Sequence, residues 1–168
     1  YRQGAEERNQ VQVIRLADLQ FPVLRSQTDY ERDEPVEAVR RCQDAIEWAM
    51  HVVILYPLWL GAMPALLKAL LEQMLRPGFA FSNEHPGRWP VKFLSGKTAR
   101  IVVTMGMPAI VYRWYFGAHS VRSLQRNILN FVGFRRVRTT FIGGIAELSK
   151  SERTAWLEKL RVLGRDGQ

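Results

Sequence analysis

The chain has 168 residues, which suits one domain burying roughly 70% of the surface that the unfolded chain exposes. Apolar residues make up 47% of it and charged residues 24%, which is ordinary for a globular protein. No apolar run reaches the ~18 residues that a membrane-spanning helix needs, so a membrane span is not expected.

The net charge of +8 and the pI near 10.1 would suit a nucleic acid, a membrane surface or an anionic small molecule as a partner. The basic residues are scattered, however, with pairs such as Arg40-Arg41 and Arg135-Arg136 but no long basic block. We therefore expect no nucleic-acid binding. Cys42 is the only cysteine, so an intramolecular disulfide is impossible, which fits a cytoplasmic protein.

The first part of the chain predicts a strand followed by a helix. Residues 1–10 are polar and resemble the end of a helix. Val11 to Leu16 alternates apolar and polar side chains, as a half-buried strand does. From Pro35 onward, apolar residues recur every three or four positions, which predicts a helix with Asp33 or Glu34 at its cap.

The stretch from His51 to Leu75 is the centre of the predicted fold. Val52 to Leu55 is apolar, rich in β-branched residues and too short for a helix, which predicts a strand buried on both faces. Pro64 suits the first turn of a helix over residues 64–75, because that turn needs no bond from its N–H. Residues 56–63 then form a loop at the carboxyl end of a strand.

The second half repeats this alternation. We expect residues 76–98 to be an ordered connection, because it contains buried-type aromatic residues, namely Phe79, Phe81 and Trp89. Strands are predicted at 99–104 and 137–142, and a helix lies between them over 121–132, stopped at Gly133. Ser149 and Glu152 have the spacing of a capping box for a last helix.

Strands that alternate with helices predict a doubly wound α/β fold, in which a parallel sheet has helices on both faces. We expect residues 1–168 to form a single domain, since the chain shows no internal repeat and no low-complexity segment.

Two loops, 56–63 and 104–112, follow parallel strands and should therefore open at the same edge of the sheet, where ligands bind in such folds. The first carries a proline, a tryptophan and a glycine (Pro57, Trp59 and Gly61), which suggests a rigid, mostly apolar ledge for a flat molecule. In the second, Thr104 offers a hydroxyl and Gly106 an approachable backbone.

Polar and aromatic residues follow the second loop. A hydride-transfer site needs apolar support for a flat cofactor and a proton donor near the accepting oxygen. Tyr112 or His119 has the chemistry of that donor. No metal-ligand spacing and no Gly-x-Ser-x-Gly nucleophile motif is present.

Two segments, residues 56–81 (YPLWLGAMPALLKALLEQMLRPGFAF) and residues 102–134 (VVTMGMPAIVYRWYFGAHSVRSLQRNILNFVGF), resemble the NAD(P)H–quinone oxidoreductase family of flavodoxin-like flavoproteins. The likeness is greatest to bacterial members of the modulator-of-drug-activity and potassium-efflux-regulator type. These segments span about a third of the chain, and a weaker similarity covers the rest.

The resemblance implies a flavin, FMN or FAD, that takes hydride from NADH or NADPH and passes it to a quinone or a similar electrophile. It also implies a homodimer with two shared active sites. By position, the family's flavin-contacting residues correspond to Pro57, Leu58, Trp59, Leu60, Thr104, Met105, Gly106 and Met107. The catalytic pair corresponds to Tyr112 and His119, and the substrate pocket to Gly61 and to Phe81, an aromatic residue that often comes from the neighbouring subunit.

One departure from the family concerns the first strand and the phosphate-binding loop that follows it. Residues 1–10 match only the end of the helix after that loop. We expect the chain to be a fragment of a longer protein, and the first strand to belong to the part that the fragment lacks. The alternative is a chain without a phosphate site, whose unpaired apolar sheet edge would favour aggregation.

Other interpretations of the same residues stay open. Trp59 and Leu60 suit a plain core, Tyr112 a buried ring with a locally bonded hydroxyl, and His119 a structural histidine. A non-enzymatic regulatory or binding subunit, for example of a transport system, and a fold that has lost its cofactor are the alternative functions.

Overall fold

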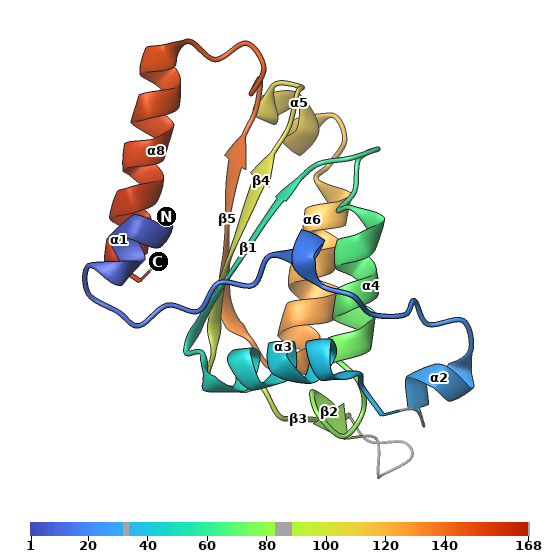
Figure 1. Cartoon of the computed structure of the whole chain (residues 1–168). Coiled ribbons are helices and arrows are strands. Elements are labelled where there is room, and N and C mark those ends of the chain that lie inside the picture. The colour runs from blue at the N-terminus through green and yellow to red at the C-terminus, as the bar shows by residue number, and fades with distance from the viewer. Residues whose placement is uncertain (32–33, 83–88, 168) are drawn as a thin grey trace.

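A three-stranded parallel sheet with strand order β1-β4-β5 lies at the centre of the computed structural model, which describes residues 1–31, 34–82 and 89–167 (Figure 1). Its strands are β1 (His51–Pro57), β4 (Thr98–Thr104) and β5 (Arg135–Ile142). A separate antiparallel pair, β2 (Phe81–Ser82) and β3 (Val91–Lys92), precedes β4. The predicted α/β fold with a parallel sheet is confirmed.

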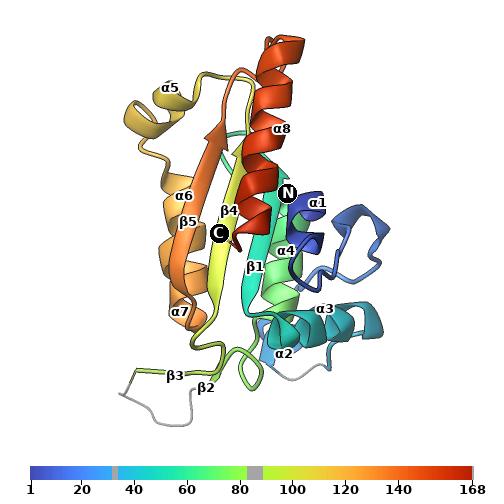
Figure 2. The same ribbon diagram turned by 90° about the vertical axis from the view of Figure 1, so that its left-hand side faces the viewer.

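Helices cover both faces of the sheet (Figures 1 and 2). On one face lie α4 (Ala65–Met74) and a continuous helical run made of α6 (His119–Ser123), the π-helical η2 (Leu124–Leu129) and α7 (Asn130–Val132). The helix α3 (Glu37–Trp48) packs against α4. The other face carries α8 (Lys150–Arg165) and the short α1 (Arg2–Glu6).

Helices cover both faces of the sheet, and the central strand β4 is the most completely buried. The prediction that Val52 to Leu55 is buried on both faces is wrong, because β1 is an outer strand in which Leu55 is 62% exposed and residues 52–54 are half-buried. In β4, Ile101, Val102 and Val103 are fully buried. The main core lies between the sheet and the helices α3, α4 and α6, and a smaller cluster around Val102 and Leu160 lies beneath α8.

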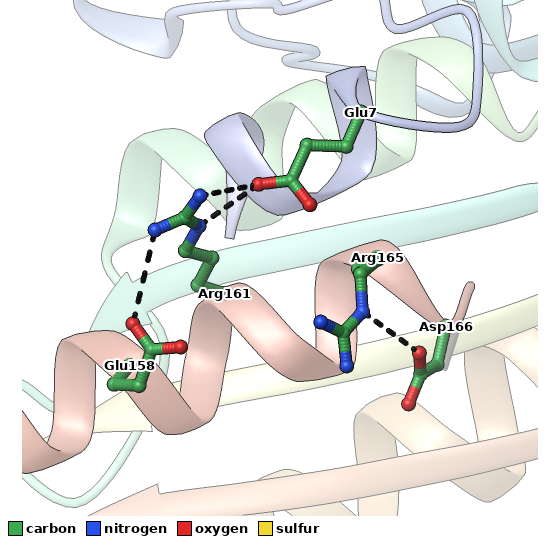
Figure 3. A network of polar contacts seen from close by, with 5 residues as sticks. All are labelled: Glu7, Glu158, Arg161, Arg165 and Asp166. Carbon is green, nitrogen blue, oxygen red and sulfur yellow. Dashed lines mark hydrogen bonds and ion pairs between the residues drawn. The ribbon is translucent and has the colours of Figure 1, made fainter.

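The ends of the chain pack together through α1 and α8. A Cβ atom on Gly4 would overlap the backbone of Arg161, and one on Gly164 would overlap the carbonyl of Tyr1, so only glycine permits this spacing. Arg161 donates from Nε and Nη2 to Glu7 Oε1 at 2.9 and 2.6 Å, and Figure 3 shows this pair reaching across the two helices.

Most predicted helices are confirmed. The helix α4 begins directly after Pro64, and the run from His119 ends at Gly133. The capping box before α8 is present, because Ser149 Oγ accepts from the Glu152 N–H while the Glu152 carboxylate accepts from the Ser149 N–H.

The predicted strand over residues 11–16 is wrong. These residues are irregular and lead into a 3-10 turn, η1 (Leu16–Asp18), with Val13 and Ile14 exposed. An alternating pattern makes a strand only where a neighbour offers backbone hydrogen bonds. Within the described residues β1 pairs with β4 alone, and Ile14, Val52 and Val53 instead line part of a cavity of about 590 Å³.

The predicted cap of α3 is also wrong where it can be checked. The N-cap is Val36, which makes no side-chain cap bond, while Glu34 instead forms an ion pair with Arg40 at 3.2 Å. Asp33 lies outside the described residues. Extended backbone at Val36 (φ −63°, ψ 158°) places the start of the helix beyond the reach of Glu34 as a cap.

The connection over residues 76–98 is only partly as expected. Phe81 is buried and Phe79 half-buried, but Trp89 is 89% exposed, so its predicted burial is wrong. Two further helices were not predicted, α2 (Gln27–Glu31) and α5 (Ala109–Trp114). Across the described part of the chain, every helix is too short or too polar to cross a bilayer.

A polar cluster lies at the start of β1, on the face beneath α1 and α8. His51 Nδ1 lies 2.7 Å from Thr98 Oγ1, and its Nε2 lies 3.3 Å from the hydroxyl of Tyr1. Burial lowers the pKa of His51 below its ordinary value of 6.5, and the positive charges of Arg100 and Arg138 lower it further.

The lowered pKa of His51 predicts a pH dependence of stability. The unfolded chain binds a proton at this residue more readily than the folded chain, so the free energy of unfolding falls as the pH drops below 6.5. We expect His51→Gln to show a weaker fall than the wild type in urea titrations between about pH 7.5 and pH 5.5. Equal slopes in the two proteins would contradict the assignment.

Candidate functional site

The three strands of the sheet end at one level, where Pro57, Thr104 and Ile142 stand side by side in register. Two backbone bonds continue the pairing beyond the strands, from Leu58 N to Thr104 O at 2.7 Å and from Met105 N to Ile142 O at 2.9 Å. The loops after β1 and β4 therefore open at the same edge, as predicted, and α5 lies beyond it (Figure 1).

The loop after β1 forms a tight turn at this edge. The N–H groups of Trp59 and Ala62 each donate to the other residue's carbonyl at 2.9 Å, and Leu60 and Gly61 adopt positive φ values of 47° and 76°. The turn leaves Trp59 62% and Leu60 107% exposed. The interpretation of these two side chains as core is therefore wrong, and they form a projecting apolar ledge.

The loop after β4 presents backbone more than side chains. Met105 is buried, Thr104 and Met107 are half-buried, and Gly106 is exposed. No atom lies within 4 Å of where a Cβ on Gly106 would stand, so a ligand can approach the backbone there. A flat ring with a polar edge fits an apolar ledge that faces an open strip of backbone.

The helix α5 enlarges the apolar surface at this edge. Pro108 stands at its N-cap, and the helix turns Tyr112 inward while Ile110, Trp114 and Tyr115 stay exposed. A sequence signal for this helix existed, because a proline followed by a short apolar run is common at a first turn. Exposed aromatic side chains that gather at one place commonly mark a binding surface.

Tyr112, one of the two predicted catalytic residues, lies in the core. Its side chain is 2% exposed, and its ring packs edge-on against Phe141 with centroids 5.8 Å apart. Burial raises the pKa of Tyr112, and the nearby Val121 N–H and Ser120 hydroxyl partly offset this. In this structure, its hydroxyl does not reach the surface of the edge.

His119, the second predicted catalytic residue, is exposed and is the first residue of α6. Its imidazole folds back over the backbone of Gly117, where a Cβ atom would stand 2.7 Å from Nε2. The two predicted catalytic residues therefore differ in access, because Tyr112 is buried and His119 is exposed.

Phe81 is not brought to this edge within one chain. It follows α4, which runs away from the edge, and lies in β2 near the amino ends of the strands (Figure 1). There it packs against Phe131 with ring centroids 5.0 Å apart, in the lining of a cavity of about 740 Å³. Gly61, the other predicted pocket residue, is at the edge.

Gly143 supports the edge and was missed by sequence reasoning. A Cβ atom on this residue would overlap the backbone N of Ala109 and stand 2.7 Å from the Met107 carbonyl oxygen. The adjacent Gly144 donates its N–H to the same oxygen at 3.1 Å. The Gly-Gly pair directly after the strand was the signal that could have revealed this close approach.

Gly143→Ala is expected to cost about 2 kcal/mol of stability, because backbone on the opposing loop cannot move aside as a side chain can. Gly144→Ala is the matched control, since its Cβ would meet nothing within 4 Å and only its φ of 60° opposes the change. Urea unfolding of both variants measures the difference. An equal loss in the two variants would show that the close approach is unimportant.

Comparisons with known proteins agree with this geometry. A family model described as a flavodoxin-like fold matches residues 1–163. Over 132 residues the chain is 29% identical to ribosyldihydronicotinamide dehydrogenase [quinone] from Mus musculus, covering 74% of this chain and 56% of the relative. The chain thus spans little more than half the length of that curated relative.

Two solved structures share the fold. An NAD(P)H:quinone oxidoreductase from Methanothermobacter marburgensis superposes with a TM-score of 0.78 at 24% identity, covering 98% of this chain and 84% of the other. An FMN-dependent NADH-azoreductase from Bacillus anthracis, in complex with FMN, gives a TM-score of 0.67 at 20% identity, covering 91% and 78%.

Proposed function

Because this chain belongs to the flavodoxin-like family, we propose that it binds a flavin and acts as an NAD(P)H oxidoreductase that reduces a quinone or a similar electrophile. The observation that carries the proposal is an exposed apolar ledge, Trp59 and Leu60, on a loop whose backbone is hydrogen-bonded to the loop with the open backbone at Gly106, through Leu58 N and Thr104 O at 2.7 Å. The names of the relatives, a quinone dehydrogenase, a quinone oxidoreductase and an azoreductase in complex with FMN, support the same activity.

The two loops have separate tasks in this proposal. Pro57, Leu58, Trp59 and Leu60 flank the ring system and keep water from it. The backbone from Thr104 to Met107 meets the polar edge of the ring. FMN or FAD, when bound, supplies the hydride chemistry between NADH or NADPH and the acceptor.

His119 is the proposed catalytic residue that touches the acceptor. An imidazole at the edge can donate a hydrogen bond or a proton to the oxygen on which negative charge develops. Tyr112 lies beneath the surface of the edge, and its neutral phenol supports the region around His119. Its burial favours the uncharged form, which is the form that donates a hydrogen bond.

A homodimer is the proposed assembly. Phe81 lies at the opposite end of the sheet from Gly61, so only a second copy could bring it to the edge as a pocket residue. Analytical ultracentrifugation measures the molar mass of the protein in solution. A fully active protein with the mass of one chain at all concentrations would contradict the proposed homodimer.

An absorption spectrum tests the function directly. The purified chain, titrated with FMN and with FAD, should show a bound flavin band that bleaches when NADH or NADPH is added without oxygen and returns when a quinone follows. A chain that binds neither flavin would overturn the proposal.

Trp59→Ala is expected to weaken flavin binding by about two- to tenfold, because an aromatic stacking contact contributes about 0.5–1.5 kcal/mol. Trp89→Ala is the control, since Trp89 is also exposed, 89% against 62% for Trp59, but lies before β3, at the other end of the sheet. Flavin fluorescence titrations compare the two. A loss of affinity in both variants, or in neither, would contradict the ledge role of Trp59.

His119→Gln should lower quinone turnover by about 100-fold and leave flavin affinity unchanged, because a positioned proton donor contributes about that factor. Tyr112→Phe should lower turnover less, since its hydroxyl is buried. Stopped-flow reoxidation of the reduced protein by a quinone isolates this step. Unchanged turnover in both variants would exclude a catalytic role for the pair.

A further inference from the structure

The turn that leads into α6 has an unusual backbone. Gly117 and Ala118 follow one another with φ values of 62° and 47°, both in the left-handed region. Ala118 is buried, and as N-cap of α6 it has no side chain able to bond the first turn. A non-glycine residue holds such a conformation only where its surroundings over-determine it.

Gly117 provides the space in which the imidazole of His119 lies. A Cβ on Gly117 would stand 2.7 Å from His119 Nε2, 3.0 Å from Cε1 and 3.2 Å from Cδ2. The distance to Nε2 is shorter than real Cβ atoms show, and the distances to Cε1 and Cδ2 are shorter than most Cβ contacts. The ring therefore packs directly on the Gly117 backbone, and a side chain at position 117 would push it away.

Three hydroxyl groups from separate elements meet beneath this turn. Tyr56 comes from β1, Tyr112 from α5 and Ser120 from the first turn of α6. Both phenols lie close enough to the Ser120 hydroxyl to affect their pKa values, and Tyr112 also lies near the Val121 N–H. All three oxygens are buried, and within the described residues none makes a hydrogen bond of standard geometry.

We propose that Gly117 and the hydroxyls of Tyr56, Ser120 and Tyr112 are positioning residues that fix the first turn of α6 and thereby hold the imidazole of His119 at the sheet edge. The inference rests on the proposed function of His119 as the residue that touches the acceptor. It adds Gly117, Tyr56 and Ser120 to the site. None of these three belongs to the ledge or to the strip of backbone after β4.

The cluster positions His119 rather than exchanging protons with the substrate. Tyr56 and Tyr112 are each at most 3% exposed, so neither phenol contacts solvent or a molecule at the edge. Burial raises the pKa of Tyr56, and Tyr112 adds to the rise. The two phenol rings and the Ser120 hydroxyl are buried beneath the first turn of α6, so close packing limits how far that turn can shift.

The test compares Gly117→Ala with Gly96→Ala in the full chain. Gly96 also has a left-handed φ, 89°, but no atom lies within 4 Å of its Cβ position, and it precedes β4 at the opposite end of the sheet. Both variants carry the backbone penalty, and only the first displaces the imidazole. Tyr56→Phe and Ser120→Ala remove single hydroxyls with little change in volume.

Two readouts are needed. Imidazole NMR signals of the flavin-free chain, with His119 assigned by its loss in His119→Gln, should shift in Gly117→Ala and Ser120→Ala but not in Gly96→Ala. In the flavin-loaded protein, Gly117→Ala should lower kcat by about 100-fold, because a catalytic group misplaced by 1 Å can cost that much. In the His119→Gln background, Gly117→Ala should cause no further loss.

Unchanged His119 signals in Gly117→Ala and Ser120→Ala would overturn the proposal, as would a kcat loss that adds in full to that of His119→Gln. The NMR result does not depend on turnover. If the wild-type chain shows no reductase activity, the proposed function fails, while a His119 signal that moves in these variants still supports the positioning of the imidazole.

Discussion

The parallel pairing of β4 with β1 on one side and β5 on the other is the constraint on which the site depends. It sets Pro57, Thr104 and Ile142 at one level, so that two loops distant in sequence leave the sheet side by side. Because Ala99 to Val103 of β4 are buried, the position of this strand is fixed by packing from both faces. The pairing of β1 with β4 therefore determines where the ledge and the open backbone at Gly106 lie.

The edge is built from close backbone approaches rather than from large side-chain contacts. Gly143 lies against the start of α5, and Gly117 lies under the imidazole of His119. At Gly143 a methyl group would meet backbone, which cannot move aside, whereas at Gly117 it would displace the imidazole of His119. Rigid support of this kind suits a site that must hold a flat ring, because a loosely held site loses the alignment of the reacting groups.

The two outer strands of the sheet, β1 and β5, differ in how well their free edges are protected against pairing with another chain. β5 carries three arginines, at 135, 136 and 138, as protected edge strands do. β1 carries a run of apolar residues from Val52 to Leu55, and within the described residues no strand pairs with its other side. A cavity of about 590 Å³ is lined in part by His51, Val52 and Val53 of β1. This strand is therefore the less protected of the two outer strands.

Elements with local signals can be predicted from the sequence: the strands, the helix after Pro64, the capping box at Ser149, and the meeting of two loops at one edge. Features that depend on a distant partner follow only from the folded arrangement. Residues 11–16 alternate like a strand but find no neighbour, and α5 turns Tyr112 into the core while His119 stays exposed. Phe81, close to the first loop in sequence, lies at the far end of the sheet because α4 carries the chain there. Local patterns specify backbone conformation, whereas burial and proximity depend on which surfaces meet after folding.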